Sequence, residues 1–328
     1  MTPGISLEIL DLRHFTAALL RPLLDAEGEL WLKRLHWDYR ASARLLMQYL
    51  DSRMLPGYAA VDAGRVLGYG FCVYEDSKAV IGDVFAAPQL AASAPEHGQT
   101  ALEIEETLLA HILETLQHSP QVERIESQLL LHPSGNHGRI FRQNGFEIYR
   151  RLFMVQQLSR HVPLDQQHLP PELELRPWRD EDLNAAGRLI SEAYTGHPDS
   201  LINDQYRSAN GSLRFLHNIV RYSGCGVFSP GVSHVAVERS SREMVGIVLG
   251  SRVSPDSGHI TQLCVRPRYR RQGLGRLLLA ASAACFQAQG IREVSLTVTE
   301  ANERAVELYK SESYTCTHMF DAAVWRRG

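Results

Sequence analysis

Five arginines and two glycines gather at one turn, in the stretch VRPRYRRQGLGRLLLA at residues 265–280. Glycine lets a backbone approach a ligand closely, and the unpaired N–H groups and dipole at a helix start favour an anion. Arginine adds paired donors for phosphate oxygens. The turn therefore indicates phosphate binding. Because the whole chain has a formal net charge of −3, we expect this local positive charge to serve one anionic ligand.

A strand before the turn and a helix after it must position these residues. The run GHITQLCV predicts a strand that ends before Pro267, and RLLLAASAACFQAQ predicts a helix that Gly290 stops. The turn lacks the GK[ST] of a Walker loop and the G-x-G-x-x-G of a dinucleotide site. A solvated basic loop with glycines for packing is the alternative interpretation.

Two motifs in this region resemble those of the GNAT acyltransferase superfamily. Arg270-x-x-Gly273-x-Gly275 matches the family motif R/Q-x-x-G-x-G/A. The segment NERAVELYKSESY at residues 302–314 resembles N-x-x-A-x-x-L-Y-x-x-x-G-F, with Ser-Tyr in place of the final Gly-Phe. The resemblance covers the chain from about residue 173 to the end. It implies an N-acetyltransferase that passes an acetyl group from acetyl-CoA directly to a primary amine.

The same resemblance implies a set of residues that bind acetyl-CoA. In the family the turn binds the pyrophosphate through backbone N–H groups, and the preceding strand pairs with the pantetheine arm, with the amide at Val265 placed to polarise the thioester carbonyl. The residues that match these positions are Leu263, Cys264, Val265, Arg270, Arg271, Gln272, Gly273, Leu274, Gly275, Arg276 and Asn302.

Acetyl transfer also needs an acid for the leaving thiolate and a base for the amine. Tyr309 stands at the family's acid position, and His259 stands where one branch of the family carries a catalytic glutamate. A histidine suits a base near neutral pH, but one at a strand start is equally typical of a hydrogen-bonded edge residue. Glu300 and an ordered water are the alternative bases. Cys264, in an apolar strand, is interpreted as a small buried hydrophobe and not as a nucleophile.

The two halves of the chain resemble repeats of each other. The segments VLGYGFCVY, VIGDVFAAP, VERIESQLLL and RIFRQNGF match MVGIVLGSR, HITQLCVRP, IREVSLTVT and VELYKSESY in the same order. We therefore expect an α+β fold with two tandem GNAT-like domains, each a mixed, largely antiparallel twisted sheet flanked by helices. The expected divisions are residues 1–160, a polar proline-bearing linker at 161–172, and a catalytic domain at 173–328.

The first half lacks the features that carry the chemistry in the second. Phe141 falls where Tyr309 falls, and Val80 falls where His259 falls. Glu103 and Glu105 stand near the start of the corresponding helix, where carboxylates would compete with a pyrophosphate. We therefore expect a degenerate, non-catalytic GNAT-like domain that supports the second half or shapes its substrate cleft.

Composition limits the other classes of function. A near-neutral charge argues against a general nucleic-acid binder. Five scattered cysteines without C-x-x-C spacing fit a reducing cytoplasm. No apolar run is long enough to span a bilayer, and the histidines show no pattern typical of a metal site. We therefore expect a cytoplasmic protein without a metal or membrane partner. The acceptor stays open among protein lysine, polyamines, amino acids and antibiotic amines, and oligomeric state cannot be read. An acyl-CoA sensor without catalysis is the alternative function.

Overall fold

The fold consists of two compact units in a computed structural model that describes residues 7–88, 100–158, 169–222 and 226–328. Unit 1 comprises residues 1–150 and 320–328, and unit 2 comprises residues 151–319. Most of the expected linker at 161–172 lies outside the described residues. Across those described ranges, no helix is both long and apolar enough to cross a membrane.

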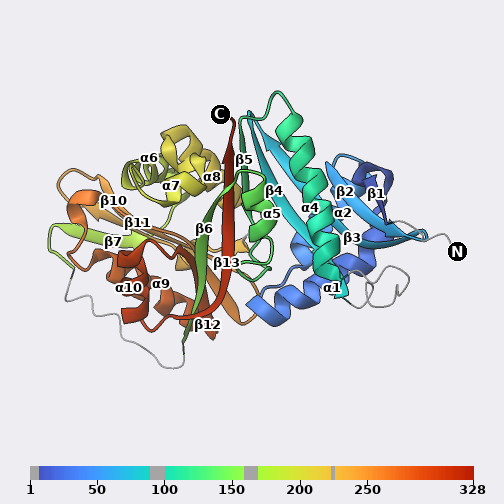
Figure 1. Cartoon of the computed structure of the whole chain (residues 1–328). Helices are drawn as coiled ribbons and strands as arrows, with labels where there is room; N and C mark the ends of the chain where they lie inside the picture. The colour runs from blue at the N-terminus through green and yellow to red at the C-terminus, as the bar shows by residue number, and fades with distance from the viewer. Residues whose placement is uncertain (1–6, 89–99, 159–168, 223–225) are drawn as a thin grey trace, which may run out of the picture. The chain divides into compact units, whose positions relative to one another are not determined.

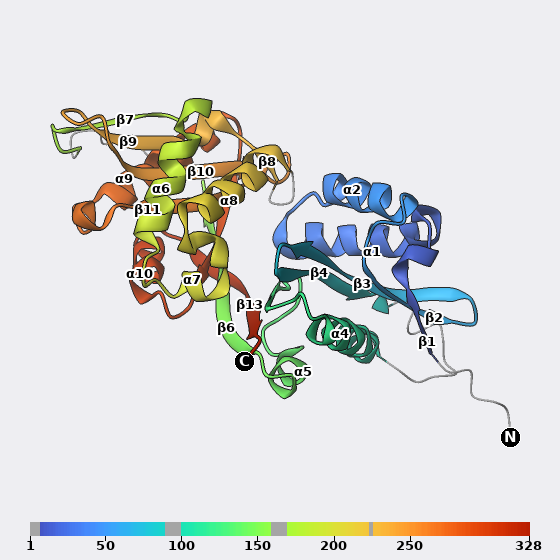
Figure 2. The same cartoon turned by 90° about the horizontal axis from the view of Figure 1, so that it is seen from above.

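Unit 1 is an antiparallel sheet with one parallel pair, covered by helices on both faces (Figures 1 and 2). Its strands lie in the order β1-β2-β3-β4-β5-β13, with α1 and α2 on one face and α4 on the other (Figure 2). The buried core beneath α4 is built from aliphatic residues of α4 and the strands. The elements are β1 (Glu8–Asp11), α1 (Ala17–Leu35), α2 (Arg40–Asp51), β2 (Gly57–Asp62), β3 (Arg65–Glu75), β4 (Lys78–Ala86), α4 (Ala101–His118), β5 (Arg124–Gln128), α5 (Gly138–Gln143) and β6 (Glu147–Gln157).

Unit 2 repeats this arrangement. Its strands lie in the order β6-β12-β11-β10-β9-β7, with β8 paired to β10. Helices α6 and α8 pack on one face and α9 on the other, each over its own apolar core. The elements are β7 (Leu173–Pro177), α6 (Leu183–Ala193), α7 (Asp199–Ile202), α8 (Ala209–Arg221), β8 (Val227–Phe228), β9 (His234–Glu238), β10 (Met244–Arg252), β11 (Ser257–Val265), α9 (Leu274–Ala288), β12 (Glu293–Thr299), α10 (Glu303–Ser311) and β13 (Thr315–Arg326).

The repeat extends to the register of the strands. In each unit the only parallel pair whose register is defined joins the strands before and after the long helix, β4 with β5 and β11 with β12. The first of these two strands also carries a β-bulge against its antiparallel neighbour. The extra residue is Gly82 of β4, against β3, in unit 1 and Thr261 of β11, against β10, in unit 2. The expected mixed α+β architecture with two similar sheets is therefore confirmed.

The two units exchange their last strands. Residues 151–157 of β6 pair with β12 in unit 2, and residues 322–326 of β13 pair with β5 in unit 1. Asp321 accepts hydrogen bonds from the Ser134 hydroxyl and the Gly135 amide, which anchors the returning strand. The observed units thus divide the chain differently from the expected 1–160 and 173–328, because strand pairing and not chain order decides which residues form a compact sheet.

Candidate active site

The candidate site opens where β11 and β12 separate. Their parallel register runs from Ser257 opposite Glu293 to Ile260 opposite Leu296, although both strands continue beyond this pair. The hydroxyl of Thr261, the residue at the bulge, donates a hydrogen bond to the carbonyl of Leu249 on β10. The separation leaves the backbone of the last residues of β11 without β12 as a neighbour, which is the geometry needed for an extended ligand to lie along the strand.

A cavity of about 600 Å³ fills this separation. It is lined by the end of β11, by β12, by the start of α9 and by α10, and it reaches the loop that follows α6. Of the residues expected to bind acetyl-CoA, all but Gln272 line it: Leu263, Cys264, Val265, Arg270, Arg271, Gly273, Leu274, Gly275, Arg276 and Asn302. The structure therefore brings the two sequence motifs to one cavity.

The glycine turn has the backbone conformation that the motif predicts. Gly273 is the N-cap of α9 with φ of 79°, in the left-handed region, and a Cβ added there would meet no atom within 4 Å. Arg271 also adopts a left-handed φ, of 67°. The backbone N–H groups of the first turn of α9 have no intrahelical partner, as at any helix start. The local geometry is that of an anion site formed mainly by the backbone.

The arginines of the turn have other partners. Arg266 and Arg268 form ion pairs with Glu243, and Arg276 forms one with Glu312. Arg270 donates hydrogen bonds to the carbonyls of Val265 and Ala193, which ties β11 to the end of α6. Arg271 alone of the five is exposed with no ion pair or hydrogen bond among the described residues. Most of the positive charge at the turn is thus compensated within the protein, unlike the expectation that it serves one ligand.

Tyr309 lies in the cavity wall from α10. Its side chain is 8% exposed and its hydroxyl has no hydrogen-bond partner among the described residues. Burial, and next the negative charge of Asp199, raise the pKa of Tyr309 above its usual value. The phenol therefore stays protonated at neutral pH, as a general acid must. Asn302, the N-cap of α10, accepts a hydrogen bond from the Ala305 amide and so holds the helix start.

His259 is placed apart from this cavity. It lies in the paired part of β11, 5% exposed, with Nδ1 2.9 Å from the Ser295 hydroxyl and its ring stacked on Phe153. Burial lowers the pKa of His259 to about 3. It does not line the cavity, and so weak a base is poorly suited to take a proton from an amine. The alternative, Glu300, is exposed in the turn after β12 and does not line the cavity.

A carboxylate from a different segment does line the cavity. Asp199, at the start of α7, is 8% exposed and accepts a hydrogen bond from the Thr299 hydroxyl at the end of β12. The Asp199 amide donates to Nδ1 of His197, so neutral His197 carries its proton on Nε2. In this tautomer Nε2 of His197 is a hydrogen-bond donor, and both His197 and Asp199 line the cavity.

Aromatic residues complete the wall near Asp199. Tyr194 stacks on Tyr206 at 4.3 Å between ring centroids and accepts a hydrogen bond from the side-chain amide of Gln262. No role for Tyr194 or Tyr206 was predicted from the sequence, because a polar loop shows no periodicity that ties it to a distant strand. The contact to Gln262, 68 residues away, exists only in the folded chain.

Cys264 lines the same cavity but is not activated. Burial raises the pKa of its thiol to about 12, and no charged partner opposes this effect strongly. The thiolate is the nucleophilic form of cysteine. Cys264 is therefore a protonated, apolar wall residue, in agreement with its interpretation from the sequence.

Comparison with known proteins places this geometry in a family. Residues 202–312 match the family described as Acetyltransferase (GNAT) family. Mycothiol acetyltransferases of Acidimicrobium ferrooxidans and Thermobispora bispora are each 30% identical to this chain, over 182 and 167 residues respectively. These alignments cover 52% and 47% of this chain and 54% and 50% of the relatives, so the chain spans about half the length of the curated relatives it matches.

Solved structures share the fold over nearly the whole chain. A GCN5-related N-acetyltransferase from Sphaerobacter thermophilus superposes with a TM-score of 0.63 at 17% identity, covering 100% of this chain and 98% of that one. A tandem GNAT protein from the clavulanic acid biosynthesis pathway gives a TM-score of 0.62 at 17% identity, covering 98% and 99%. The fold expected from the sequence is confirmed. Residues 202–312 are similar to the GNAT acetyltransferase family, and the chain has the fold of tandem GNAT proteins.

Proposed function

We propose that unit 2 transfers the acetyl group of acetyl-CoA to a primary amine of a small molecule. The observation that carries this proposal is the single cavity that joins the glycine turn at Gly273, the end of β11 beyond its pairing with β12, the protonated Tyr309 and the carboxylate of Asp199. The names of the curated relatives, mycothiol acetyltransferases, support a small-molecule acceptor. The cytoplasm, expected from the cysteine pattern, is the compartment we propose for the reaction.

Acetyl-CoA binds with its pyrophosphate at the start of α9 and its pantetheine arm along residues 263–265. The N–H groups at the turn supply most of the attraction, since four of the five arginines there have partners in the protein. Arg271 supplies the free positive charge at the rim. The amide at Val265 lies near the thioester carbonyl in this arrangement and polarises it.

The acceptor binds as an ammonium against Asp199. The carboxylate takes a proton from the ammonium, directly or through a water, and the free amine attacks the thioester carbonyl carbon. A C–N bond forms, the C–S bond breaks, and the Tyr309 hydroxyl gives its proton to the departing thiolate. The second proton that leaves the nitrogen passes to solvent, and solvent reprotonates Tyr309 and deprotonates Asp199. In this proposal Asp199 takes the role first considered for His259, because His259 is buried behind the wall of the cavity.

Turnover by the purified chain tests the proposal. Acetyl-CoA is titrated into the protein, and free CoA thiol and acetylated product are measured with a panel of small amines. One acetyl-CoA bound per chain and amine-dependent thiol release are expected. Binding without turnover on any amine would favour an acyl-CoA sensor, and absence of binding would remove the assignment of the turn.

The variant Tyr309→Phe is expected to lower kcat by roughly 10²–10⁴-fold, the usual contribution of a general acid, without loss of acetyl-CoA binding. Tyr314→Phe is the matched control, because Tyr314 is buried next to Tyr309, at 5.9 Å between ring centroids, but does not line the cavity. An unchanged kcat in Tyr309→Phe would show that another group protonates the thiolate.

A further inference from the structure

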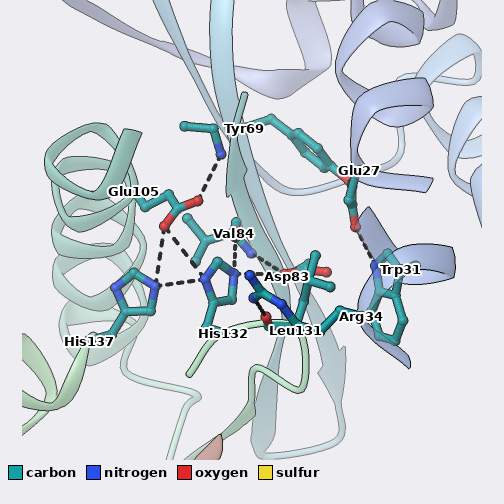
Figure 3. Close-up of polar contacts among 11 residues, drawn as sticks. Glu27, Trp31, Arg34, Tyr69, Asp83, Val84, Glu105, Leu131, His132 and His137 are labelled. Carbon is teal, nitrogen blue, oxygen red and sulfur yellow. Dashed lines mark hydrogen bonds and ion pairs between the residues drawn. The ribbon is translucent and has the colours of Figure 1, made fainter. Parts of the chain in front are cut away.

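A second cluster of chemically capable side chains lies in unit 1. Glu105 of α4, His132 in the loop after β5, and His137, the N-cap of α5, meet in the interior (Figure 3). They are 6%, 7% and 4% exposed. Figure 3 shows both imidazole rings turned toward the Glu105 carboxylate from one side. The mechanism proposed for unit 2 uses none of these residues.

The three facing atoms form a nearly equilateral triangle. His132 Nδ1 and His137 Nε2 are 3.3 Å apart, and each lies 3.5 Å from Oε2 of Glu105. Ligands bonded to one tetrahedral ion at about 2.0–2.1 Å are separated by roughly 3.3–3.4 Å. Adjacent ligands of an octahedral ion at the same bond length are only about 3.0 Å apart. The triangle therefore matches one face of a tetrahedron better than one face of an octahedron.

Two of the three residues of the triangle are held from behind as metal ligands usually are, whereas Nδ1 of His137 is buried without a hydrogen-bond partner among the described residues. His132 Nε2 lies 2.8 Å from the Val84 carbonyl, which accepts its proton and leaves Nδ1 with a free lone pair. The amide of Ala86 donates to the other carboxylate oxygen of Glu105 at 3.0 Å. A histidine ligand typically donates its second N–H to a carbonyl or carboxylate, and a ligating carboxylate is itself hydrogen-bonded.

The carboxyl groups near the triangle also favour a cation. Two more carboxyl groups, those of Asp83 and Glu27, are buried nearby at 6% and 0% exposed (Figure 3). Asp83 Oδ1 lies 3.8 Å from His132 Nε2. Among the described residues, no lysine or arginine forms an ion pair with either of them or with Glu105. A divalent ion bound at the triangle would favour the ionised form of these buried carboxyl groups.

The internal repeat shows where in the fold the cluster lies. The pairing of β4 with β5 ends at Ile81 opposite Ser127, the counterpart of the β11–β12 separation in unit 2. Val84, which the His132 ring reaches, lies on β4 beyond this last pair. In unit 2 the region where the two parallel strands separate is a cavity, whereas in unit 1 the His132 side chain contacts β4 in the corresponding region. The first half has exchanged the groups of an acetyl-transfer site for two histidines and a carboxylate.

We propose that Glu105, His132 and His137 bind one divalent transition-metal ion, Zn²⁺, with tetrahedral geometry. Two imidazole nitrogens and one carboxylate oxygen are ligands that Zn²⁺ accepts, and the fourth position takes a water. The ion joins α4 to the loop between β5 and α5 and so stabilises unit 1. No metal was expected from the sequence. His132 and His137 are separated by four residues, within the range of zinc-binding histidine pairs, but Glu105 is far from them in the sequence and only the fold brings it to them.

Zinc binding by the full chain tests this proposal. The protein is stripped with a chelator, dialysed against Zn²⁺, and its metal content measured, with Co²⁺ as a spectroscopic substitute. One Zn²⁺ per chain, a raised Tm in its presence, and the intense visible bands of tetrahedral Co²⁺ are expected. A chain that retains no Zn²⁺, or that gives only the weak bands of octahedral Co²⁺, would overturn the proposal. These readouts do not depend on acetyltransferase activity.

Isosteric variants locate the site. Glu105→Gln and His137→Gln each remove one ligand and are expected to weaken Zn²⁺ binding by at least about 10–100-fold, the loss typical even of an outer-shell partner. His118→Gln is the matched control, because His118 is an exposed histidine at the end of the same helix. Equal Zn²⁺ content in all three variants would mean adventitious binding elsewhere and would overturn the proposal. If the ligand variants do not fold, the Co²⁺ spectrum of the unchanged chain decides.

Discussion

Asp199 and Tyr309 both line the cavity of unit 2. Asp199 is a carboxylate that accepts a hydrogen bond from Thr299, and its negative charge adds to burial in raising the pKa of Tyr309. A negative charge beside a phenol favours the protonated form of the phenol. The catalytic assignment therefore rests on the relation between the two groups and not on either residue alone.

The role of Asp199 is testable by an isosteric change. Asp199→Asn keeps the acceptor oxygen for Thr299 but removes the charge, and we expect kcat/KM for the amine to fall by roughly 10²–10⁴-fold. Asp204→Asn is the control, since Asp204 lies five residues further along the same segment and does not line the cavity. Steady-state kinetics with a fixed amine measure both. An Asp199→Asn enzyme with full kcat/KM would return the base role to another group.

His259 is expected to affect stability at acidic pH. Burial lowers its pKa in the folded chain to about 3, whereas an unfolded histidine has a pKa of about 6.5. The unfolded chain therefore binds a proton first as pH falls, so the free energy of unfolding decreases between about pH 6.5 and pH 3.

His259→Gln removes this titration, and its free energy of unfolding should fall less steeply over that pH range, as measured by urea unfolding at a series of pH values. The slope of the unchanged chain is the reference. His137 retains its own contribution in the variant, because burial lowers its pKa to about 3 as well. Equal slopes in both proteins would contradict a buried, neutral His259.

At the scale of elements, the separation of β11 from β12 and the turn before α9 form the site together. The strands make room for the ligand, and the helix start supplies N–H donors. The arginines mostly hold elements in place: Arg270 joins β11 to α6, and Arg276 joins α9 to the end of α10. The charge at the turn is therefore as much a structural feature as a ligand site.

Gly273→Asp tests the backbone anion site. An aspartate there places a negative charge and a side chain against the pyrophosphate position, and we expect KM for acetyl-CoA to rise sharply. Gly290→Asp is the matched control, because Gly290 follows the other end of α9 with φ of 81°, against 79° for Gly273, and a Cβ is equally free of contacts.

The two substitutions carry the same backbone strain, on the order of 1–2 kcal/mol for a left-handed residue. Similar losses of stability but a changed KM in Gly273→Asp alone would support the assignment. Equal KM values in both folded variants would contradict it.

At the scale of the whole molecule, each unit depends on a strand from the other half of the sequence. Residues 320–328 belong to unit 1, where Ala323 joins the core and Arg327 donates hydrogen bonds to two carbonyls at the C-terminal end of α4, those of Gln117 and Ser119. Residues 151–157 belong to unit 2. Neither half of the sequence therefore contains a complete sheet.

A fragment of residues 1–160 is expected to be less stable than unit 1 of the full chain, because β5 loses its neighbour β13 and exposes an open edge. Thermal unfolding and size-exclusion chromatography should show a lower Tm and association. Adding a peptide of residues 315–328 should restore part of the lost stability, and a scrambled peptide should not. A fragment that unfolds like the full chain would show that β13 is dispensable for unit 1.

The sequence by itself determined the two motifs that resemble the GNAT family, the internal repeat and the glycine turn before α9, because each depends on residues that are close together in the chain. A glycine that caps a helix, or a tyrosine one turn from a helix end, has the same local geometry wherever the helix packs. Only the tertiary structure decided which distant side chains meet. In the folded chain His259 is buried, Asp199 and Tyr309 line one cavity, and acidic residues pair with most of the arginines of the turn. Each unit also takes up a strand from the other half of the sequence, and Glu105 lies beside two histidines. These outcomes depend on strand pairing and packing between segments many residues apart, and no local pattern encodes them.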